Sequence, residues 1–262
     1  MREPSVLGSA YRAVSNERGP SKPQVRKEGR PKMSAAAIAK TGTKPTDRAV
    51  DPDHRFLSDR GISPNTAQHF GVGVYEGPGL AGNRLLVPIC NERGQHMGHA
   101  ERSISSSTEP HYQFLFDRED CQTLFNCHQA AYYMRASCTD EVIVVADFLD
   151  CLKVHQAGFP NVVALGDREL TGWQEGLLRS LPDLTHVSVF MDRDQKGSSS
   201  ALDLANRLFW DLYVTVVWPP ADAAKKIYVH ELNDSEINEL LVGKGHSIPK
   251  EMPEQMRLPY IH

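Results

Sequence analysis

From Glu141 onward, short apolar runs alternate with amphipathic segments. The runs are "EVIVVA", "NVVALG", "HVSVFMD" and "YVTVVW", and each is brief and rich in β-branched residues, as is typical of buried strands. Between them lie "LDCLKVHQAG", "TGWQEGLLRSL" and "SSALDLANRLFWDL", which have the composition and length of helices. Because strand–helix alternation with short loops favours parallel pairing, this pattern predicts an α/β fold with a mostly parallel sheet and helices on both faces.

A smaller region of mixed helix and strand precedes the predicted sheet. Ser63 stands directly before a proline, which marks a helix start, and Gly71 marks the end of that helix. The stretch "RLLVPICNERGQHMGHAERSI" then holds two apolar runs around a turn that ends in Gly94, which predicts a β-hairpin. A further helix is expected near 126–136. The sequence therefore predicts an α+β subdomain with a β-hairpin ahead of the α/β sheet.

The cysteines and histidines give no metal-binding pattern. The five cysteines include no CxxC pair and no spaced set with histidines, so we expect no zinc site. His96 and His99 lie three positions apart on the predicted hairpin, and strand alternation would place them on opposite faces. Scattered cysteines, the absence of a membrane-length apolar run and a start without a signal-peptide core together predict a soluble, cytoplasmic protein with no membrane partner.

The charge is divided unevenly along the chain. Residues 1–50 carry eleven Lys and Arg against four Asp and Glu, whereas the remainder carries eighteen against twenty-nine. The basic segment is rich in Pro and Ser and shows no periodicity, so it is either a nucleic-acid contact or a disordered, solubilising tail. We predict four parts: a basic tail at 1–50, the hairpin subdomain at 51–138, the sheet domain at 139–242 and a C-terminal tail at 243–262.

Acidic residues follow two of the predicted strands. Asp192 and Asp194 come after the third strand in "FMDRDQKG", and their side chains would project to the same side if the strand continued. Asp147 and Asp150 stand at the turn after the first strand. Carboxyl ends of parallel strands share one edge of a sheet, so these four acids are expected to approach one pocket, where paired carboxylates suit Mg²⁺. The alternative is that Asp147 or Asp150 only caps the following helix.

The order of these motifs resembles a known family. The stretches "VIVVADFLD", "HQAGFPNVVALG" and "FMDRDQKG" resemble the TOPRIM domain of bacterial primases, topoisomerases and some nucleases. "FLSDRGISPNTAQHFGVGVY" and the hairpin resemble the amino-terminal half of the bacterial primase catalytic core, and "NDSEINELL" resembles the acidic helix start that closes it. The resemblance covers roughly residues 54–241 and implies a TOPRIM-type sheet preceded by a primase-core-like subdomain.

The resemblance also implies a function in DNA replication or processing. It implies nucleotidyl transfer on single-stranded DNA that depends on Mg²⁺ or Mn²⁺, with nucleoside triphosphates as substrates and a replicative helicase as a candidate partner. His111 falls where a lysine often stands in the family. The family's site residues map onto metal ligands at Asp192 and Asp194, catalytic acids at Asp147 and Asp150, and nucleic-acid or nucleotide contacts at Arg84 and Arg102.

One position departs from the family pattern. TOPRIM domains carry a glutamate at the end of the first strand as general acid/base or metal ligand, and Ala146 occupies that position here. Alanine can neither move a proton nor hold an ion, and loss of a general acid/base costs about 10²–10⁴-fold in rate. Asp147, which replaces a glycine of the family, or a relocated set of acids that includes Asp167 and Glu169, is a candidate substitute.

Three other functions share parts of this sequence pattern. The first alternative is a TOPRIM module that has lost turnover and binds DNA or a replication partner. A haloacid-dehalogenase-type phosphohydrolase is disfavoured because its DxD motif ends the first strand and is followed by a small residue. Here the motif ends the third strand and Gln195 follows. Nuclease activity fits the acidic pair but not the primase-like half upstream.

Overall fold

The computed structural model describes residues 50–76, 83–104, 112–114, 123–167, 169–220 and 228–243. These residues all fall within one compact unit of the chain. The predictions made for the basic tail up to residue 49, for residues 244–262 and for His111 fall outside the described ranges.

The first sheet is antiparallel and is preceded by two short helices. Its strands pair in the order β1-β2-β3-β4, and β2 and β3 form the predicted hairpin. The second helix begins as expected, because Ser63 Oγ accepts a hydrogen bond from the Thr66 amide and Gly71 ends the helix at φ 66°. The bounds are α2 (Arg55–Ser58), α3 (Pro64–Phe70), β1 (Gly73–Tyr75), β2 (Arg84–Cys90), β3 (His96–Ser103) and β4 (Gln113–Phe114).

A β-bulge in the hairpin overturns the prediction made for its two histidines. The pairing is regular up to Gly98 but then shifts, so that Cys90 pairs with His96 and Met97 is the extra residue of β3. A bulge inverts the alternation of faces for one step. The rings of His96 and His99 therefore lie side by side, with their centroids 4.8 Å apart. The expectation that these rings face opposite sides was wrong.

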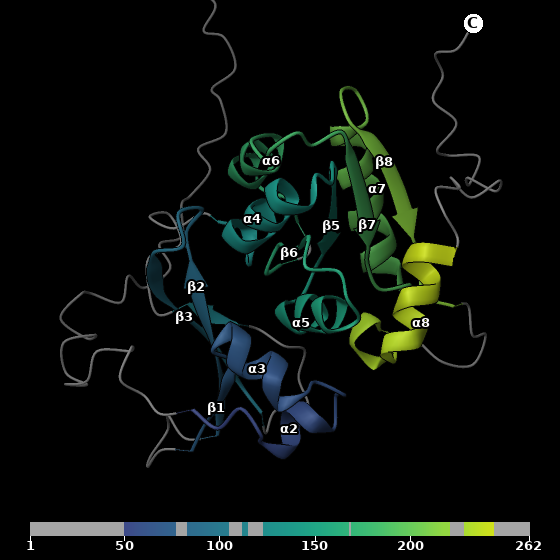
Figure 1. Ribbon diagram of the computed structural model, residues 1–262. Helices are drawn as coiled ribbons and strands as arrows, with labels where there is room; N and C mark the ends of the chain where they lie inside the picture. The colour runs from purple at the N-terminus through teal and green to yellow at the C-terminus, as the bar shows by residue number, and fades with distance from the viewer. Residues whose placement is uncertain are drawn as a thin grey trace, which may run out of the picture. The chain divides into compact units, whose positions relative to one another are not determined.

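The second sheet confirms the predicted parallel fold. Its four strands pair in parallel in the order β6-β5-β7-β8 (Figure 1). The chain therefore passes from β5 to β6 on one side of it and then crosses to β7 on the other side. The carboxyl ends of β5 and β7 consequently form a topological switch point, which is where such sheets bind their ligands. The strands are β5 (Glu141–Val145), β6 (Val162–Ala164), β7 (His186–Phe190) and β8 (Tyr213–Val217).

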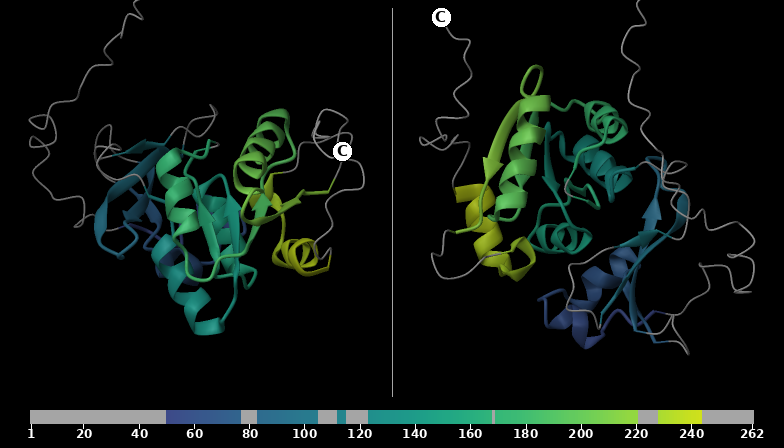
Figure 2. Two further views of the ribbon diagram at one scale, coloured as in Figure 1. Left: turned by 90° about the horizontal axis from the view of Figure 1, so that it is seen from above. Right: turned by 180° about the vertical axis from the view of Figure 1, so that it is seen from behind.

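Helices cover both faces of this sheet (Figures 1 and 2). Ile143 and Val145 of β5 pack with α5 (Phe148–Gln156) and with buried residues of the first sheet. Val142 and Val144 point the other way and pack with α4 (Cys127–Ser137), α6 (Gly172–Arg179) and α7 (Gln195–Leu208). The described chain ends with η3 (Val229–Glu231), α8 (Asp234–Asn238) and η4 (Glu239–Gly243). Of the helices in the described ranges, none is long and apolar enough to cross a membrane.

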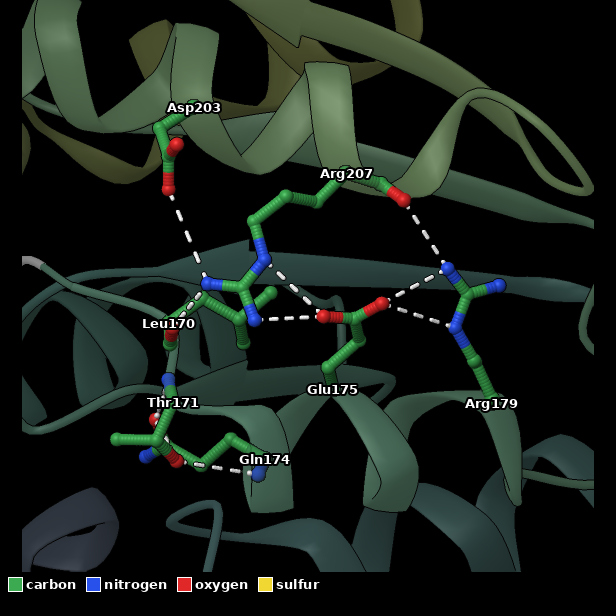
Figure 3. A network of polar contacts seen from close by, with 7 residues as sticks. All are labelled: Leu170, Thr171, Gln174, Glu175, Arg179, Asp203 and Arg207. Carbon is green, nitrogen blue, oxygen red and sulfur yellow. Dashed lines mark hydrogen bonds and ion pairs between the residues drawn. The ribbon is translucent and has the colours of Figure 1, made fainter. Parts of the chain in front are cut away.

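A polar network joins α6 to α7 (Figure 3). Glu175 Oε2 accepts hydrogen bonds from Arg207 Nε at 3.0 Å and Nη2 at 2.6 Å. Glu175 Oε1 accepts from Arg179 Nη2 at 2.9 Å, and the same nitrogen donates to the Arg207 carbonyl at 3.0 Å. The helix that carries Glu175 begins with a capping box formed by Thr171 and Gln174. One carboxylate thus fixes two guanidinium groups and the spacing of two helices.

Candidate functional site at the carboxyl edge of the parallel sheet

The turn after β5 contains two acids and one alanine. The side chain of Asp147 caps α5, because its Oδ1 accepts the Leu149 amide at 2.8 Å. Asp150 Oδ2 in turn accepts the Asp147 amide at 3.3 Å, which completes a capping box. Both acids therefore cap α5, and a catalytic role for either of them stays a prediction. Ala146 is buried beside them and contributes no polar group.

The turn after β7 holds the acidic pair. Because β7 ends at Phe190, Asp192 and Asp194 lie beyond the strand and its alternation does not set their directions. Asp192 is buried, and its Oδ1 accepts the amide of Val229 at 3.0 Å. Asp194 caps α7, with its Oδ1 accepting the Gly197 amide at 2.6 Å. Both carboxylates are therefore oriented by backbone amides at the strand end.

The short helix η3 connects the two strand ends. Val229 donates to Asp192 from the β7 side, and the next residue, His230, places its Nδ1 3.2 Å from Asp150 Oδ1 on the β5 side. Burial lowers the pKa of His230, but the hydrogen bond to Asp150 and the surrounding carboxylates outweigh it, so the pKa lies above its usual value. His230 was not predicted, because only the tertiary fold carries it to Asp150.

The first sheet contributes one arginine to this edge. Arg102 of β3 is buried, and its Nη1 lies 4.0 Å from Asp147 Oδ2. Its guanidinium also lies over the rings of Phe56 and Tyr112, at 5.2 and 5.5 Å from their centroids. The Tyr112 hydroxyl donates to Asp147 Oδ1 at 3.1 Å. An arginine, a tyrosine and an acid therefore meet where α5 begins.

Burial sets the protonation behaviour of this group. It raises the pKa of the Tyr112 hydroxyl well above its usual value, and the charge of Asp147 adds to that rise. Burial also raises the pKa of Asp147, the neighbouring Asp150 raises it further, and Arg102 opposes both. Negative charge is therefore costly on Tyr112 and on Asp147.

The second predicted arginine lies on the other face of the first sheet. Arg84 Nε is 3.2 Å from Glu101 Oε1, and Arg84 Nη2 donates to Gln113 at 3.2 Å. Glu101 directly precedes Arg102 on β3, so their side chains point to opposite faces. The structure therefore does not bring Arg84 and Arg102 together. A contact of Arg84 with nucleic acid stays a prediction for that other face.

A different arginine joins Arg102. Arg60 follows α2 and its guanidinium lies over the Phe56 ring at 3.7 Å from the centroid, the same ring that Arg102 approaches. Burial lowers the pKa of Arg60, and the positive charge of Arg102 lowers it further. Sequence reasoning missed Arg60, because an arginine between a helix and a glycine has the pattern of an ordinary surface loop.

The prediction that Asp192 and Asp194 bind a metal ion requires that a substrate supplies further ligands. Over the described ranges, no three His, Cys, Asp or Glu side chains are grouped so that they could hold a metal ion. Mg²⁺ is commonly bound by one or two carboxylates together with waters and substrate phosphates, rather than by a complete protein cage. Asp192 and Asp194 supply such a pair. The other candidate acids, Asp167 and Glu169, are exposed after β6.

Comparisons with known proteins agree with this architecture. Residues 140–217 match the family model described as the Toprim domain. A DNA primase of Staphylococcus aureus (strain MSSA476) is 25% identical over 187 residues, which cover 67% of this chain and 30% of that protein. The RNA polymerase domain of Mycobacterium tuberculosis primase DnaG superposes with a TM-score of 0.57 at 20% identity, and the match covers 79% of this chain and 80% of that one.

A third matched structure is a complex with a nucleic acid. It is the DnaG primase catalytic domain bound to single-stranded DNA, with a TM-score of 0.52 and 18% identity over 69% of this chain and 66% of that one. The fold is therefore that of a primase catalytic core, and the comparisons support a primase-like TOPRIM protein. The chain spans less than a third of the length of the curated primases it matches.

Proposed function

We propose that this protein carries out Mg²⁺-dependent nucleotidyl transfer on single-stranded DNA as a primase-like TOPRIM protein of DNA replication. The observation that carries the proposal is the position of Arg102, a buried guanidinium from the first sheet beside the acids that follow β5. A cation next to carboxylates at a switch point is suited to phosphate groups and a divalent ion together. The likeness to primase cores supports the same reading.

The residues have separate roles in this proposal. Asp192 and Asp194 would hold Mg²⁺ with the phosphates of a nucleoside triphosphate, and the ion would neutralise charge on the reacting phosphate. Arg102 binds and orients a phosphate from the opposite side. The Val229 amide fixes Asp192, while Tyr112 and the α5 capping box fix Asp147. Asp150 holds His230 at the same edge. Catalysis then consists mainly of positioning and charge neutralisation.

Template-directed incorporation of a labelled nucleotide tests the proposal. The wild-type protein should extend on single-stranded DNA with added Mg²⁺ or Mn²⁺ and should stop when the ion is chelated. The double substitution Asp192→Asn/Asp194→Asn should abolish incorporation. The control substitution Asp53→Asn, which changes an exposed acid just before α2, should leave it unchanged. Incorporation that survives the double substitution would refute the assigned site.

A second function is favoured by one observation. Ala146 leaves the end of β5 without an acid, and the neighbouring Asp147 and Asp150 are engaged as a capping box. A protein with this arrangement could bind DNA or a replication partner without turnover. Such a protein would bind labelled single-stranded DNA in an Arg102-dependent manner and would incorporate no nucleotide with either ion. Deletion of residues 1–50 tests whether the basic tail adds to that binding, by the loss of affinity and of salt dependence.

A further inference from the structure

We propose that His230 is a further catalytic residue at this edge of the sheet, a general base that is oriented by Asp150. His230 belongs to η3, and its Nδ1 lies 3.2 Å from Asp150 Oδ1. The inference rests on the proposed function, because it names the group that takes the proton from the attacking hydroxyl. His230 was not predicted from the sequence, and the comparisons assign it no role.

The first observation is that the turn after β5 offers no unoccupied base. Ala146 is buried there and has no polar side-chain group. Asp147 Oδ1 accepts hydrogen bonds from the Leu149 amide and from the Tyr112 hydroxyl. Asp150 Oδ2 accepts the amide of Asp147. Since these bonds engage both carboxylates, a base that serves this edge is better supplied by another element.

The second observation is the orientation of the imidazole ring. The side chain of Asp150 is 1% exposed and that of His230 is 28% exposed, so the ring connects a buried carboxylate with the surface. A carboxylate accepts hydrogen bonds, so Nδ1 of His230 carries the hydrogen and Nε2 holds the lone pair of the neutral ring. Nε2 therefore faces away from Asp150. An acid that fixes Nδ1–H and leaves Nε2 as the base is the arrangement of the Ser-His-Asp triad.

Contacts on either side hold His230 between the two strand ends. The preceding residue, Val229, donates its amide to Asp192 Oδ1 at 3.0 Å. The ring of Tyr228 stacks on the imidazole, with centroids 5.6 Å apart and an angle of 16° between the planes. His230 is thus fixed between Asp150 after β5 and Asp192 after β7. The carboxyl ends of these two strands form the switch point where a substrate is expected.

The charges around His230 favour the protonated ring that the reaction would produce. Burial lowers the pKa of His230, but the hydrogen bond to Asp150 and the surrounding carboxylates raise it, so that it lies above its usual value. A base with a pKa close to neutrality combines a populated neutral form with a strong affinity for the proton. The titratable groups that surround the ring are Asp147 and Asp150 after β5, Asp192 after β7, and Tyr228 and Glu231 on η3 itself.

The proposed step is a displacement at phosphorus. The 3′ oxygen of the growing strand attacks the α-phosphorus of a nucleoside triphosphate, and a new oxygen–phosphorus bond forms while the hydroxyl proton passes to His230 Nε2. The bond from the α-phosphorus to the bridging oxygen breaks, and pyrophosphate leaves with the electron pair. Asp150 stabilises the imidazolium, which then releases its proton to water.

NMR of the isotopically labelled wild-type protein tests the Asp150–His230 pair apart from any turnover. The neutral ring of His230 should carry its hydrogen on Nδ1, and its pKa should lie above that of an ordinary histidine. Asp150→Asn should lower this pKa, because the carboxylate that stabilises the imidazolium is lost. A neutral ring with its hydrogen on Nε2, or a pKa that is unchanged in Asp150→Asn, would overturn the inference.

The pH dependence of nucleotide incorporation tests the base itself. The wild-type rate should rise with pH through the pKa of His230 and then level off, because only the neutral ring accepts a proton. His230→Gln, which keeps an amide donor for Asp150, should lower the plateau rate about 10²–10⁴-fold and remove the rise. His96→Gln, the same change at an exposed histidine of the hairpin, should leave both unchanged. Thermal unfolding of each variant shows that it is folded.

Added imidazole distinguishes a chemical role of His230 from a structural one. Imidazole should restore part of the incorporation that His230→Ala loses, in proportion to its free-base concentration, and a purely structural role would not produce that dependence. Incorporation by His230→Gln with the rate and pH profile of the wild-type protein would overturn the inference and leave the proposed function standing. Absence of incorporation by the wild-type protein would remove both.

Discussion

Replacement of Gly197 by alanine tests whether the turn that carries Asp192 and Asp194 is built as described. Gly197 lies in the first turn of α7, and a Cβ added there would lie 2.2 Å from the carbonyl oxygen of Asp192 and 3.2 Å from Asp194 Oδ1. The first distance is far below any van der Waals contact, and the atom in the way belongs to the backbone. The turn between β7 and α7 must therefore move to accept the methyl group.

The expected magnitude follows from two opposing effects. Overpacking in a fixed environment costs about 1–3 kcal/mol, and a backbone obstacle places this position at the upper end. Alanine recovers about 1 kcal/mol over glycine in a helix. The net loss in the free energy of unfolding is therefore about 2 kcal/mol, which corresponds to a fall in Tm of about 4–8 °C for a domain of this size.

Gly176 provides the matched control. It lies inside α6 with nothing within 4 Å of an added Cβ, so Gly176→Ala should raise the free energy of unfolding by about 0.5–1 kcal/mol. Differential scanning calorimetry of the two variants beside the wild-type protein measures both effects. Opposite shifts are expected. A Gly197→Ala variant as stable as Gly176→Ala would refute the close approach of α7 to the Asp192 carbonyl.

Two further predictions concern polar groups away from the site. Glu175→Gln should lower the free energy of unfolding by about 1 kcal/mol at pH 7, because the partly exposed carboxylate binds two arginines. Hydrogen bonds from Arg207 and Arg179 hold the pKa of Glu175 below its usual value, so this stabilisation is present above the unfolded pKa and is lost as pH falls through the folded one. Denaturant titrations at pH 7 and in acid check this, and an equal loss at both would contradict it. Burial and the nearby His69 lower the pKa of His155 to about 4. The unfolded chain therefore binds a proton at this residue below about pH 6.5, whereas the folded protein binds it only below about pH 4. Stability should therefore fall between about pH 6.5 and 4, and His155→Phe should flatten that decline; an unchanged pH profile would argue against a buried neutral His155.

Local sequence signals, namely helix caps and short β-branched runs, were enough to predict the elements of the fold. The serine–proline start and Gly71 end bound α3, and the capping box at Thr171 opens α6. The short β-branched runs became the four parallel strands. The faces of His96 and His99 were predicted wrongly because the extra residue Met97 inverts the alternation of side chains along β3. A prediction from the sequence assumes that this alternation is unbroken.

The site was predictable only in part. The acids at the strand ends were found, because parallel topology brings carboxyl ends to one edge. Their partners were not found, since Arg60 and His230 reach the site through contacts between elements distant in the chain. The direction of Arg84 depended on the pairing register of β2 and β3, which the sequence pattern alone does not fix to one residue.

The most direct measurement is the rate of nucleotide incorporation by Ala146→Glu compared with wild type. The substitution places an acid at the end of β5, beside Asp147 and at the same edge of the sheet as the acidic pair after β7, and a gain in rate cannot come from misfolding. We expect slow, Mg²⁺-dependent incorporation by the wild-type protein and an increase of about 10²-fold or more in the variant, the amount a general acid/base contributes. Folded Ala146→Glu protein that incorporates no faster than wild type, or not at all, would contradict the assignment of this edge as a nucleotidyl-transfer site.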